Sequence, residues 1–213
     1  MKIKAAIFDL DGTVVADEDE YGEAFNRVLR RFGIDTGTSY PHVAGIGVEE
    51  NWEIFLSKNK SKIDKSIEEL SQDTQKEYLK LLERVNPKDG FIEFVQLIRN
   101  EGVKTALATS NSWFVTDKIL EKLSLEDYFD CITTAEEVDH KKPDPQIFEI
   151  TIAKLGLLPK ECVVFEDSRA GVVAAKALGI KVIAFFRSEE HKKTLKKADV
   201  IVRDFTELEI DDL

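Results

Sequence analysis

A short apolar run that ends in two acids is the feature that most constrains the fold of this chain. Ala5–Phe8 is continuously apolar, which is typical of a strand buried on both faces of a sheet. Asp9 and Asp11 follow at its carboxyl end, and Gly12 favours a turn there. Because isolated carboxylates are costly to remove from water, this ending predicts a bound cation or a catalytic use of one acid. Taken alone, the same residues would also suit a solvated acidic turn.

Composition limits the classes of partner. The 213 residues are 43% hydrophobic, which is enough for one core domain with a smaller companion. The net charge of −11 argues against binding to nucleic acid or to an anionic membrane. No apolar stretch approaches the length of a membrane span, and the first residues lead into a strand rather than a signal peptide. Cys131 and Cys162 lack metal-ligand spacing, so we expect reduced core cysteines in a cytoplasmic protein.

The pattern of predicted secondary structure changes near residue 87. Residues 16–86 carry apolar side chains at helical spacing and predict a small helical cap domain inserted after the first strand. Residues 1–15 and 87–213 predict the core, since strands and helices alternate there. The predicted strands cover residues 103–109, 131–134, 162–165, 181–186 and 199–202, and the predicted helices cover 88–101, 113–123, 145–155 and 170–178. The expected fold class is α/β, with a doubly wound, Rossmann-like parallel sheet.

Polar residues follow successive predicted strands, at the edge where ligands bind in doubly wound sheets. Asp9, Glu166 and Asp167 could hold a hard cation such as Mg²⁺ through oxygen ligands. Each group also has an ordinary structural interpretation when taken separately. Their joint placement at strand ends favours a common site for phosphoryl transfer, which depends mainly on positioning and charge neutralisation.

Other residues at the same edge suit the phosphate itself. Thr109 and the backbone amides of Ser110 and Asn111 could donate hydrogen bonds to phosphate, and Lys142 adds a positive charge. Asp11 could serve as general acid and base. Taken separately, residues 109–112 would be read as a helix N-cap region, and Lys142 as an exposed loop lysine.

The chain resembles the haloacid dehalogenase superfamily, in the phosphatase and phosphomutase branch that carries a helical cap after the first strand. The resemblance extends over nearly the whole length and rests on motifs in the expected order. These are Phe8-Asp9-Leu10-Asp11-Gly12-Thr13, Leu107-Ala108-Thr109-Ser110-Asn111, Lys142-Pro143-x-Pro145-x-x-Phe148 and Phe165-Glu166-Asp167-Ser168-x-Ala170-Gly171.

The resemblance implies a role for each matched residue. Asp9 stands in the nucleophile position and Asp11 in that of the acid/base. Thr109 matches the phosphate-binding hydroxyl, Lys142 the motif lysine and Asp167 the principal metal ligand. The metal in this family is normally magnesium, held also by the backbone carbonyl at the Asp11 position.

Within the family, Asp11 argues for phosphoryl chemistry, because the dehalogenases lack this second aspartate. The well-known sugar mutases carry a histidine shortly after a tyrosine in the first cap helix, whereas here Gly22 follows Tyr21. We therefore predict a magnesium-dependent phosphatase that hydrolyses a small phosphorylated metabolite, such as phosphoglycolate or a sugar phosphate, through an aspartyl-phosphate. The alternatives are a beta-phosphoglucomutase-like sugar phosphomutase and a non-enzymatic binding module.

The prediction extends to substrate contacts and assembly. Residues Gly45-Ile46-Gly47 form the cap loop that we expect to contact substrate. A monomer or small homo-oligomer is expected.

Overall fold

The computed structural model describes residues 2–36, 47–59 and 63–213. Gly45 and Ile46, of the loop predicted to meet substrate, lie outside these residues. Within the described ranges, no helix combines the length and the apolar character that crossing a bilayer requires.

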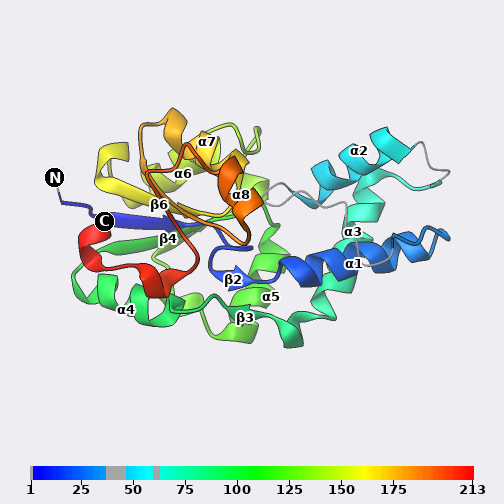
Figure 1. Ribbon diagram of the computed structural model, residues 1–213, viewed down its shortest axis with the longest axis horizontal. Coiled ribbons are helices and arrows are strands. Elements are labelled where there is room, and N and C mark those ends of the chain that lie inside the picture. Colours follow the sequence, from blue (N-terminus) through cyan, green and yellow to red (C-terminus); the bar gives the residue numbers. More distant parts are fainter. Residues whose placement is uncertain (1, 37–46, 60–62) are drawn as a thin grey trace.

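A six-stranded sheet forms the centre of the core, in the order β5-β4-β1-β6-β7-β8, and every neighbouring pair is parallel (Figure 1). Its strands are β1 (Ala5–Phe8), β4 (Lys104–Ala108), β5 (Cys131–Thr133), β6 (Cys162–Glu166), β7 (Lys181–Phe185) and β8 (Val200–Val202). The predicted doubly wound α/β fold is confirmed. Because β1 lies between β4 and β6, the acids that follow it fall near the middle of the sheet edge.

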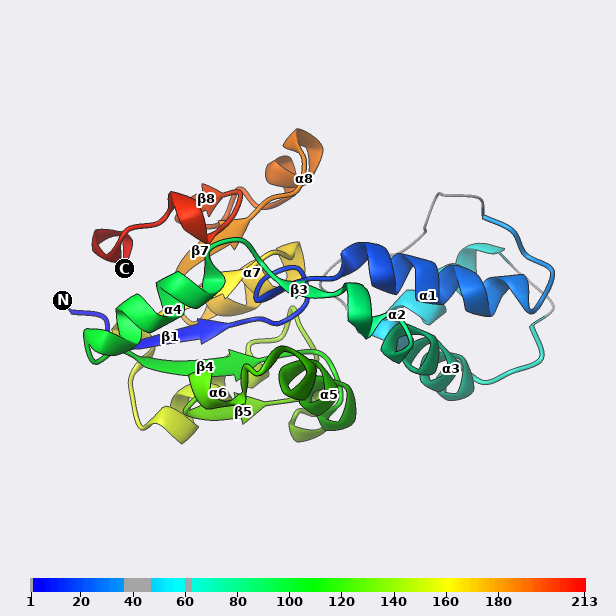
Figure 2. The same cartoon turned by 90° about the horizontal axis from the view of Figure 1, so that it is seen from below.

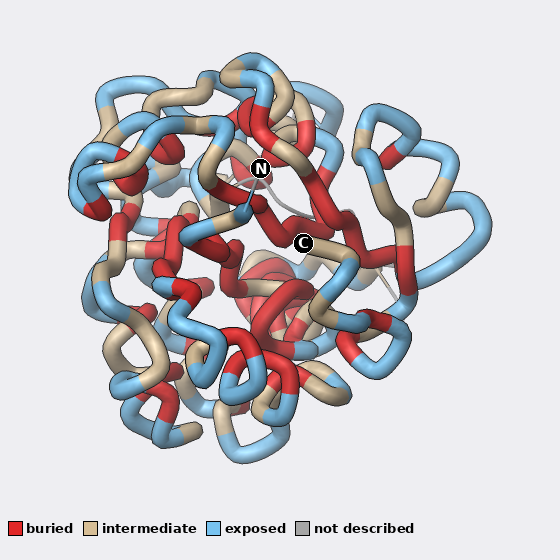
Figure 3. Tube along the Cα trace, turned by 90° about the vertical axis from the view of Figure 1, so that its left-hand side faces the viewer, coloured by how far each residue is buried: buried red, intermediate tan, exposed pale blue. Residues whose placement is uncertain are grey.

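Helices cover both faces of the sheet, which explains the continuous apolar character of β1. Ala6 and Phe8 pack on the face covered by α4 (Phe91–Asn100) and α5 (Trp113–Leu123). Ala5 and Ile7 pack on the opposite face, against α6 (Gln146–Leu155) and α7 (Arg169–Ala177). Figure 3 shows the buried segments running through the middle of the molecule, with exposed turns around them. The successive side chains of one strand thus fill two cores.

The cap has a core of its own. It consists of α1 (Glu18–Arg30), α2 (Val48–Asn59) and α3 (Ile67–Leu79), which lie to one side of the sheet (Figure 2). Phe25 stacks on Trp52 with 3.9 Å between ring centroids, and Leu70 packs in the same cluster. An independent apolar cluster of this kind allows the cap to hold its shape as one body.

Two short strands join the cap to the core. β2 (Val15–Ala16) pairs antiparallel with β3 (Asn86–Pro87), so the outgoing and returning chains are held together. The sequence did not predict this pair, because two residues are too few to give a periodic signal. The division into residues 1–15, 16–86 and 87–213 stays a prediction.

Several element boundaries differ from those expected. The helix predicted over residues 88–101 begins at Phe91, because residues 86 and 87 belong to β3 and Gly90 has φ 77°. Within the predicted helical cap, α3 begins after Ser66, where Ser66 and Glu69 form a reciprocal capping box. The remaining elements are α8 (Glu189–Thr194) and single 3₁₀ turns at Leu82–Arg84, Glu126–Tyr128, Ala135–Glu137, Pro159–Glu161, Phe205–Glu207 and Ile210–Asp212.

Candidate active site

Lys142 ties together the ends of the central strands. Its Nζ donates to Asp9 Oδ1 at 2.6 Å, to Glu166 Oε1 at 2.7 Å and to the Ala108 carbonyl at 3.2 Å. Only 2% of its side chain is exposed, so it is not the exposed loop lysine of the ordinary interpretation. Although burial opposes the charge, Asp9 and Glu166 hold the pKa of Lys142 above its usual range. It remains a cation among acids.

Asp9, Glu166 and Asp167 form a buried acidic cluster. Each offers a carboxylate oxygen within 4.8 Å of the oxygens of the other two. Glu166 is already engaged, since its Oε2 accepts from both the amide and the hydroxyl of Ser168 at 2.8 Å. Neither oxygen of Asp167 has a hydrogen-bond partner among the described residues, although both are buried. An unpartnered buried carboxylate is costly, and an oxygen-seeking divalent cation would remove that cost. The cluster therefore fits such an ion.

Gly12 is required where the turn after β1 passes the cluster. Its φ of +72° is in the left-handed region, and a Cβ there would lie 2.3 Å from Asp167 Oδ2. The absence of a side chain lets the turn approach Asp167 closely. The sequence indicated a turn at Gly12, whereas this contact with a residue far along the chain appears only in the fold.

The acids of the site are easily protonated when no cation is present. Burial raises the pKa of Asp9 to about 7 despite the opposing effect of Lys142. Burial and the adjacent Asp17 raise the pKa of Asp11 well above its usual range. Burial, with the charge of Glu18, does the same for the pKa of Asp167.

The side chain of Asn111 connects Asp11 to the cap. Its Nδ2 donates to Asp11 Oδ2 at 2.7 Å, and its Oδ1 accepts from the hydroxyl of Tyr21 at 2.8 Å. Tyr21 stacks on Tyr78, whose hydroxyl donates to Asp17 Oδ2 at 2.6 Å. The sequence suggested only the backbone amide of Asn111. The contacts of its side chain span 90 and 100 residues, so no local pattern could have predicted them.

Asp17 is a second site residue that the sequence did not identify. It stands at the N-cap of α1, where an aspartate normally binds a helix amide. Here its carboxylate instead accepts from the Gly12 amide at 3.2 Å and from Tyr78. An acid directly before a helix was the available signal, and capping would have been the ordinary interpretation of it.

Thr109 and Ser110 lie at the carboxyl end of β4. Thr109 is fully buried, and its Oγ1 accepts from the backbone amide of Asn111 at 3.0 Å. That amide was predicted to meet phosphate directly, but here it orients the threonine hydroxyl, whose hydrogen is left to donate. Ser110 lines a cleft of about 210 Å³ between core and cap, to which Gly47 and Gln75 also contribute. The phosphate-binding roles of these residues stay predictions.

Comparison with known proteins agrees with this geometry. The profile of the family described as "Haloacid dehalogenase-like hydrolase" matches residues 6–185, most of the chain. The chain belongs to this family.

Individual relatives are phosphatases and a mutase. The "Phosphorylated carbohydrates phosphatase" of Thermotoga maritima is 33% identical over 85% of this chain and 84% of its own length. "Hexitol phosphatase B" of Escherichia coli (strain K12) is 29% identical over 100% of this chain and 97% of its own length. The crystal structure of a beta-phosphoglucomutase from Clostridium difficile superposes with a TM-score of 0.85 at 24% identity, and the match covers 99% of this chain and 95% of that one. The last likeness shows the fold alone.

This haloacid dehalogenase-like hydrolase is a phosphatase, that is, a phosphoric monoester hydrolase. The fold, the buried acids and the lysine that binds them are the parts such a reaction needs. The role of each residue within the reaction is a matter for proposal.

In the absence of a divalent cation, the stability of this hydrolase is expected to fall as pH rises. The site acids have folded-state pKa values above the unfolded value of about 4, so the folded state binds protons more tightly. That stabilisation is complete below about pH 4. It is lost as pH rises through the folded-state pKa values of these acids, and the value for Asp9 is about 7. Thermal melts at several pH values, with chelator or with magnesium, measure this.

Magnesium should therefore raise the melting temperature more at pH 8 than at pH 5. At a concentration of about a hundred times its Kd, it adds about 2.7 kcal/mol. An increment equal at both pH values, or greater at pH 5, would contradict the assignment of the cluster as a cation site.

Replacing Tyr21 by phenylalanine is expected to lower kcat about fivefold and to change KM little. The variant loses one hydrogen bond, of about 1 kcal/mol, that fixes Asn111 and through it Asp11. Tyr128→Phe is the matched control, because the Tyr128 hydroxyl meets only exposed Gln96 among the described hydrogen bonds. Unchanged steady-state kinetics in the Tyr21 variant would show that this link does not position Asp11.

Proposed function

We propose that this enzyme is a magnesium-dependent phosphatase of a phosphorylated sugar or sugar alcohol, acting through a phosphoryl group carried by Asp9. The observation that carries the proposal is the hydrogen bond from buried Lys142 to Asp9. A second acid, Asp11, lies beside it and accepts a hydrogen bond from Asn111. A site for binding alone has no need of two acids fixed in this way. The family's usual dependence on magnesium and the unpartnered oxygens of Asp167 support the choice of cofactor.

In the first step, a carboxylate oxygen of Asp9 attacks phosphorus and the bond from phosphorus to the ester oxygen breaks. Asp11 donates its proton to that oxygen, which leaves as an alcohol. The raised pKa of Asp11 supports this role, because burial and the charge of Asp17 favour its protonated form.

In the second step, water attacks phosphorus and the bond to Asp9 breaks, which restores the carboxylate. Asp11, now ionised, takes the proton from that water. Lys142 binds Asp9 throughout and favours its ionised form before attack. Thr109 and the backbone amide of Ser110 would hold the phosphate oxygens by hydrogen bonds, and the Asn111 amide, which donates to Thr109, would orient the threonine hydroxyl.

Magnesium would be held by Asp9 and Asp167, with the backbone carbonyl of Asp11, and would neutralise charge on the transferring phosphoryl group. Glu166 belongs to the same cluster, but its oxygens already accept from Lys142 and Ser168. We assign it mainly to positioning Lys142.

The polar lining of the cleft between cap and core is evidence for a substrate whose leaving group carries several hydroxyls. The lining includes the polar residues Gln75, Ser110, Ser112 and Glu136, which carry hydrogen-bond donors and acceptors, besides the apolar Val48 and Ala135. The relatives named for phosphorylated carbohydrates and hexitol phosphate agree with such a substrate. Phosphoglycolate, the smaller predicted substrate, would leave most of these groups unused.

A sugar phosphomutase is the second candidate, since beta-phosphoglucomutases share the fold. Gly22 stands where the sugar mutases carry a histidine, which favours hydrolysis. The test is phosphate release from a panel of hexose phosphates, hexitol phosphates and phosphoglycolate, with and without magnesium, beside an isomerisation assay on glucose phosphates. Magnesium-dependent release that exceeds isomerisation is expected. Isomerisation that exceeds release would establish a mutase, and no activity in either assay would favour a binding module.

A cytoplasmic location, the absence of nucleic-acid and membrane partners, and a monomer or small homo-oligomer are also proposed. The net charge of −11 supports the second of these, because such partners attract basic surfaces.

A further inference from the structure

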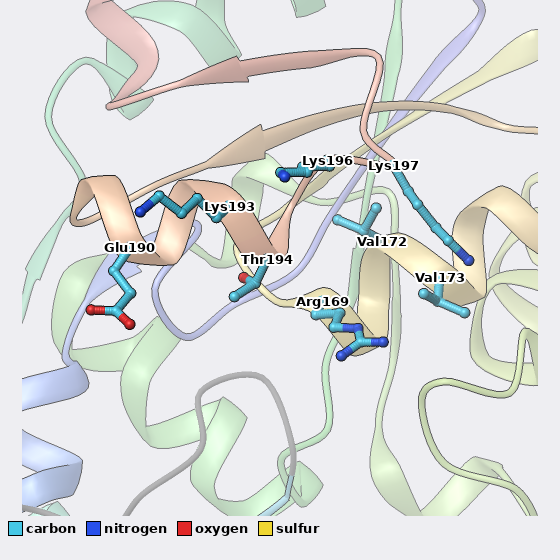
Figure 4. A pocket seen from close by; sticks show the side chains of 8 residues that line it. All are labelled: Arg169, Val172, Val173, Glu190, Lys193, Thr194, Lys196 and Lys197. Atoms are coloured by element: carbon cyan, nitrogen blue, oxygen red, sulfur yellow. The ribbon is translucent and has the colours of Figure 1, made fainter.

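A basic pocket lies between α7 and α8. It has a volume of about 440 Å³ and is bounded by the first turns of α7, by α8 and by the segment after α8 (Figure 4). We call it the α7–α8 pocket; its lining residues are Arg169, Val172, Val173, Glu190, Lys193, Thr194, Lys196 and Lys197. None of these belongs to the cluster of Asp9, Glu166 and Asp167.

The charge of this pocket is opposite to that of the whole chain. Its lining carries Arg169, Lys193, Lys196 and Lys197 but only one acid, Glu190, in a protein of net charge −11. None of these four cations makes an ion pair with any residue in the described part of the chain. A gathering of uncompensated like charges costs energy, which a bound anion would recover.

Neighbouring cations on the same elements are engaged in other ways. Lys176 of α7 pairs with Asp199 at 2.9 Å, and Arg187, just before α8, pairs with Glu18 at 3.0 Å. Lys192 of α8 lies over the ring of Phe186, 4.6 Å from its centroid. The unpaired cations are therefore concentrated at the pocket, rather than being a general property of this surface.

The pocket also has room and an apolar surface for a carbon skeleton. Its volume is within the range of ordinary small-molecule sites. Val172 is buried and Val173 half-buried on the α7 wall. Arginine and lysine together are the usual partners of phosphate groups. We propose that the α7–α8 pocket binds a small organic anion that carries at least two phosphate groups, at a site separate from the catalytic one.

The test is an NMR titration of the metal-free, full-length protein with inorganic pyrophosphate, followed through the backbone amide signals. Shifts are expected to cluster at residues 169–173 and 193–197, whether or not a second cluster appears around Asp9 and Thr109. Fructose bisphosphate, a larger probe with two phosphate groups, should in addition perturb Val172 and Val173 more strongly. Raising the salt from about 50 to about 500 mM should weaken binding about tenfold.

Variants of lysines in and beside the pocket test whether pyrophosphate binds there. Lys193→Gln combined with Lys197→Gln should weaken the binding of pyrophosphate at the pocket by about tenfold or more, because two of the four cations are lost. Lys192→Gln is the control, since it removes a cation from the same helix but not from the pocket. Lys193 and Lys197 are exposed and Lys192 is half-buried, and the amide spectrum itself reports whether each variant is folded.

Three outcomes would overturn the proposal. Shifts confined to the surroundings of Asp9 and Thr109 would place all binding at the catalytic site. Equal weakening in the double variant and the Lys192 control would show only a diffuse charge effect. Binding of pyrophosphate without fructose bisphosphate would exclude the organic ligand. Because this test uses no turnover, a failure of the proposed phosphatase reaction would leave its result unaffected.

Discussion

Asp9→Asn is expected to reduce turnover by about 10⁴-fold or more, because an amide cannot attack phosphorus as a carboxylate does. The amide oxygen of asparagine can still accept from Lys142, so the arrangement around the site should persist. The loss should therefore fall on kcat, with substrate binding largely kept. Steady-state kinetics on the best substrate of the panel, with a melting curve of the variant, measure both effects.

Asp19→Asn is the matched control for this result. It makes the same chemical change at an exposed residue of the first turn of α1, and near-normal kinetics are expected. If Asp9→Asn retained more than about a hundredth of the normal kcat, Asp9 would not be the nucleophile.

Lys142→Gln has the largest expected effect on stability. Its removal leaves Asp9 and Glu166 buried without their cation, and breaking a buried pair of this kind typically costs about 3–5 kcal/mol. Lys141→Gln is the neighbouring control, because Lys141 pairs with Glu49 at the surface, where such a pair contributes about 0–1 kcal/mol. Urea unfolding of both variants gives the comparison. Equal stability of the two would contradict the structural role of Lys142.

The pH dependence of the Lys142 variant provides a second test. Without the lysine, the main effect that opposes burial is lost, so the folded-state pKa of Asp9 should rise above about 7. Stability conferred by a raised pKa is present at low pH and lost as pH rises. The stability difference from the unmodified protein should therefore be smaller at pH 5 than at pH 8, and a difference that grew on acidification would refute the account.

The fold could be predicted from the sequence because its signals are local. The apolar run of Ala5–Phe8 and the later alternation of strands and helices specify a parallel sheet covered on both faces. Parallel strands bring their carboxyl ends to one edge of the sheet. The sequence alone therefore predicted that Asp9 and Asp167 lie close together. The β2–β3 pair was too short to be detected in this way.

The supporting contacts of the site could not be predicted, because they depend on the packing of cap against core. Asn111 was expected to act through its backbone, yet its side chain links Asp11 to Tyr21. Lys142 was open to interpretation as a surface residue, because burial of a loop lysine depends on the acids that meet it in three dimensions. Asp17 had the sequence position of a helix cap, but its carboxylate accepts hydrogen bonds from the Gly12 amide and the Tyr78 hydroxyl.

The most direct test of the central claim is to trap the phosphoryl-enzyme. The enzyme would be quenched in acid during turnover with magnesium and its best substrate, digested, and analysed by mass spectrometry. The account predicts one phosphoryl group on the peptide that contains Asp9, and none in the Asp9→Asn variant treated identically. A phosphoryl group on another residue, or none while phosphate is being released, would contradict it.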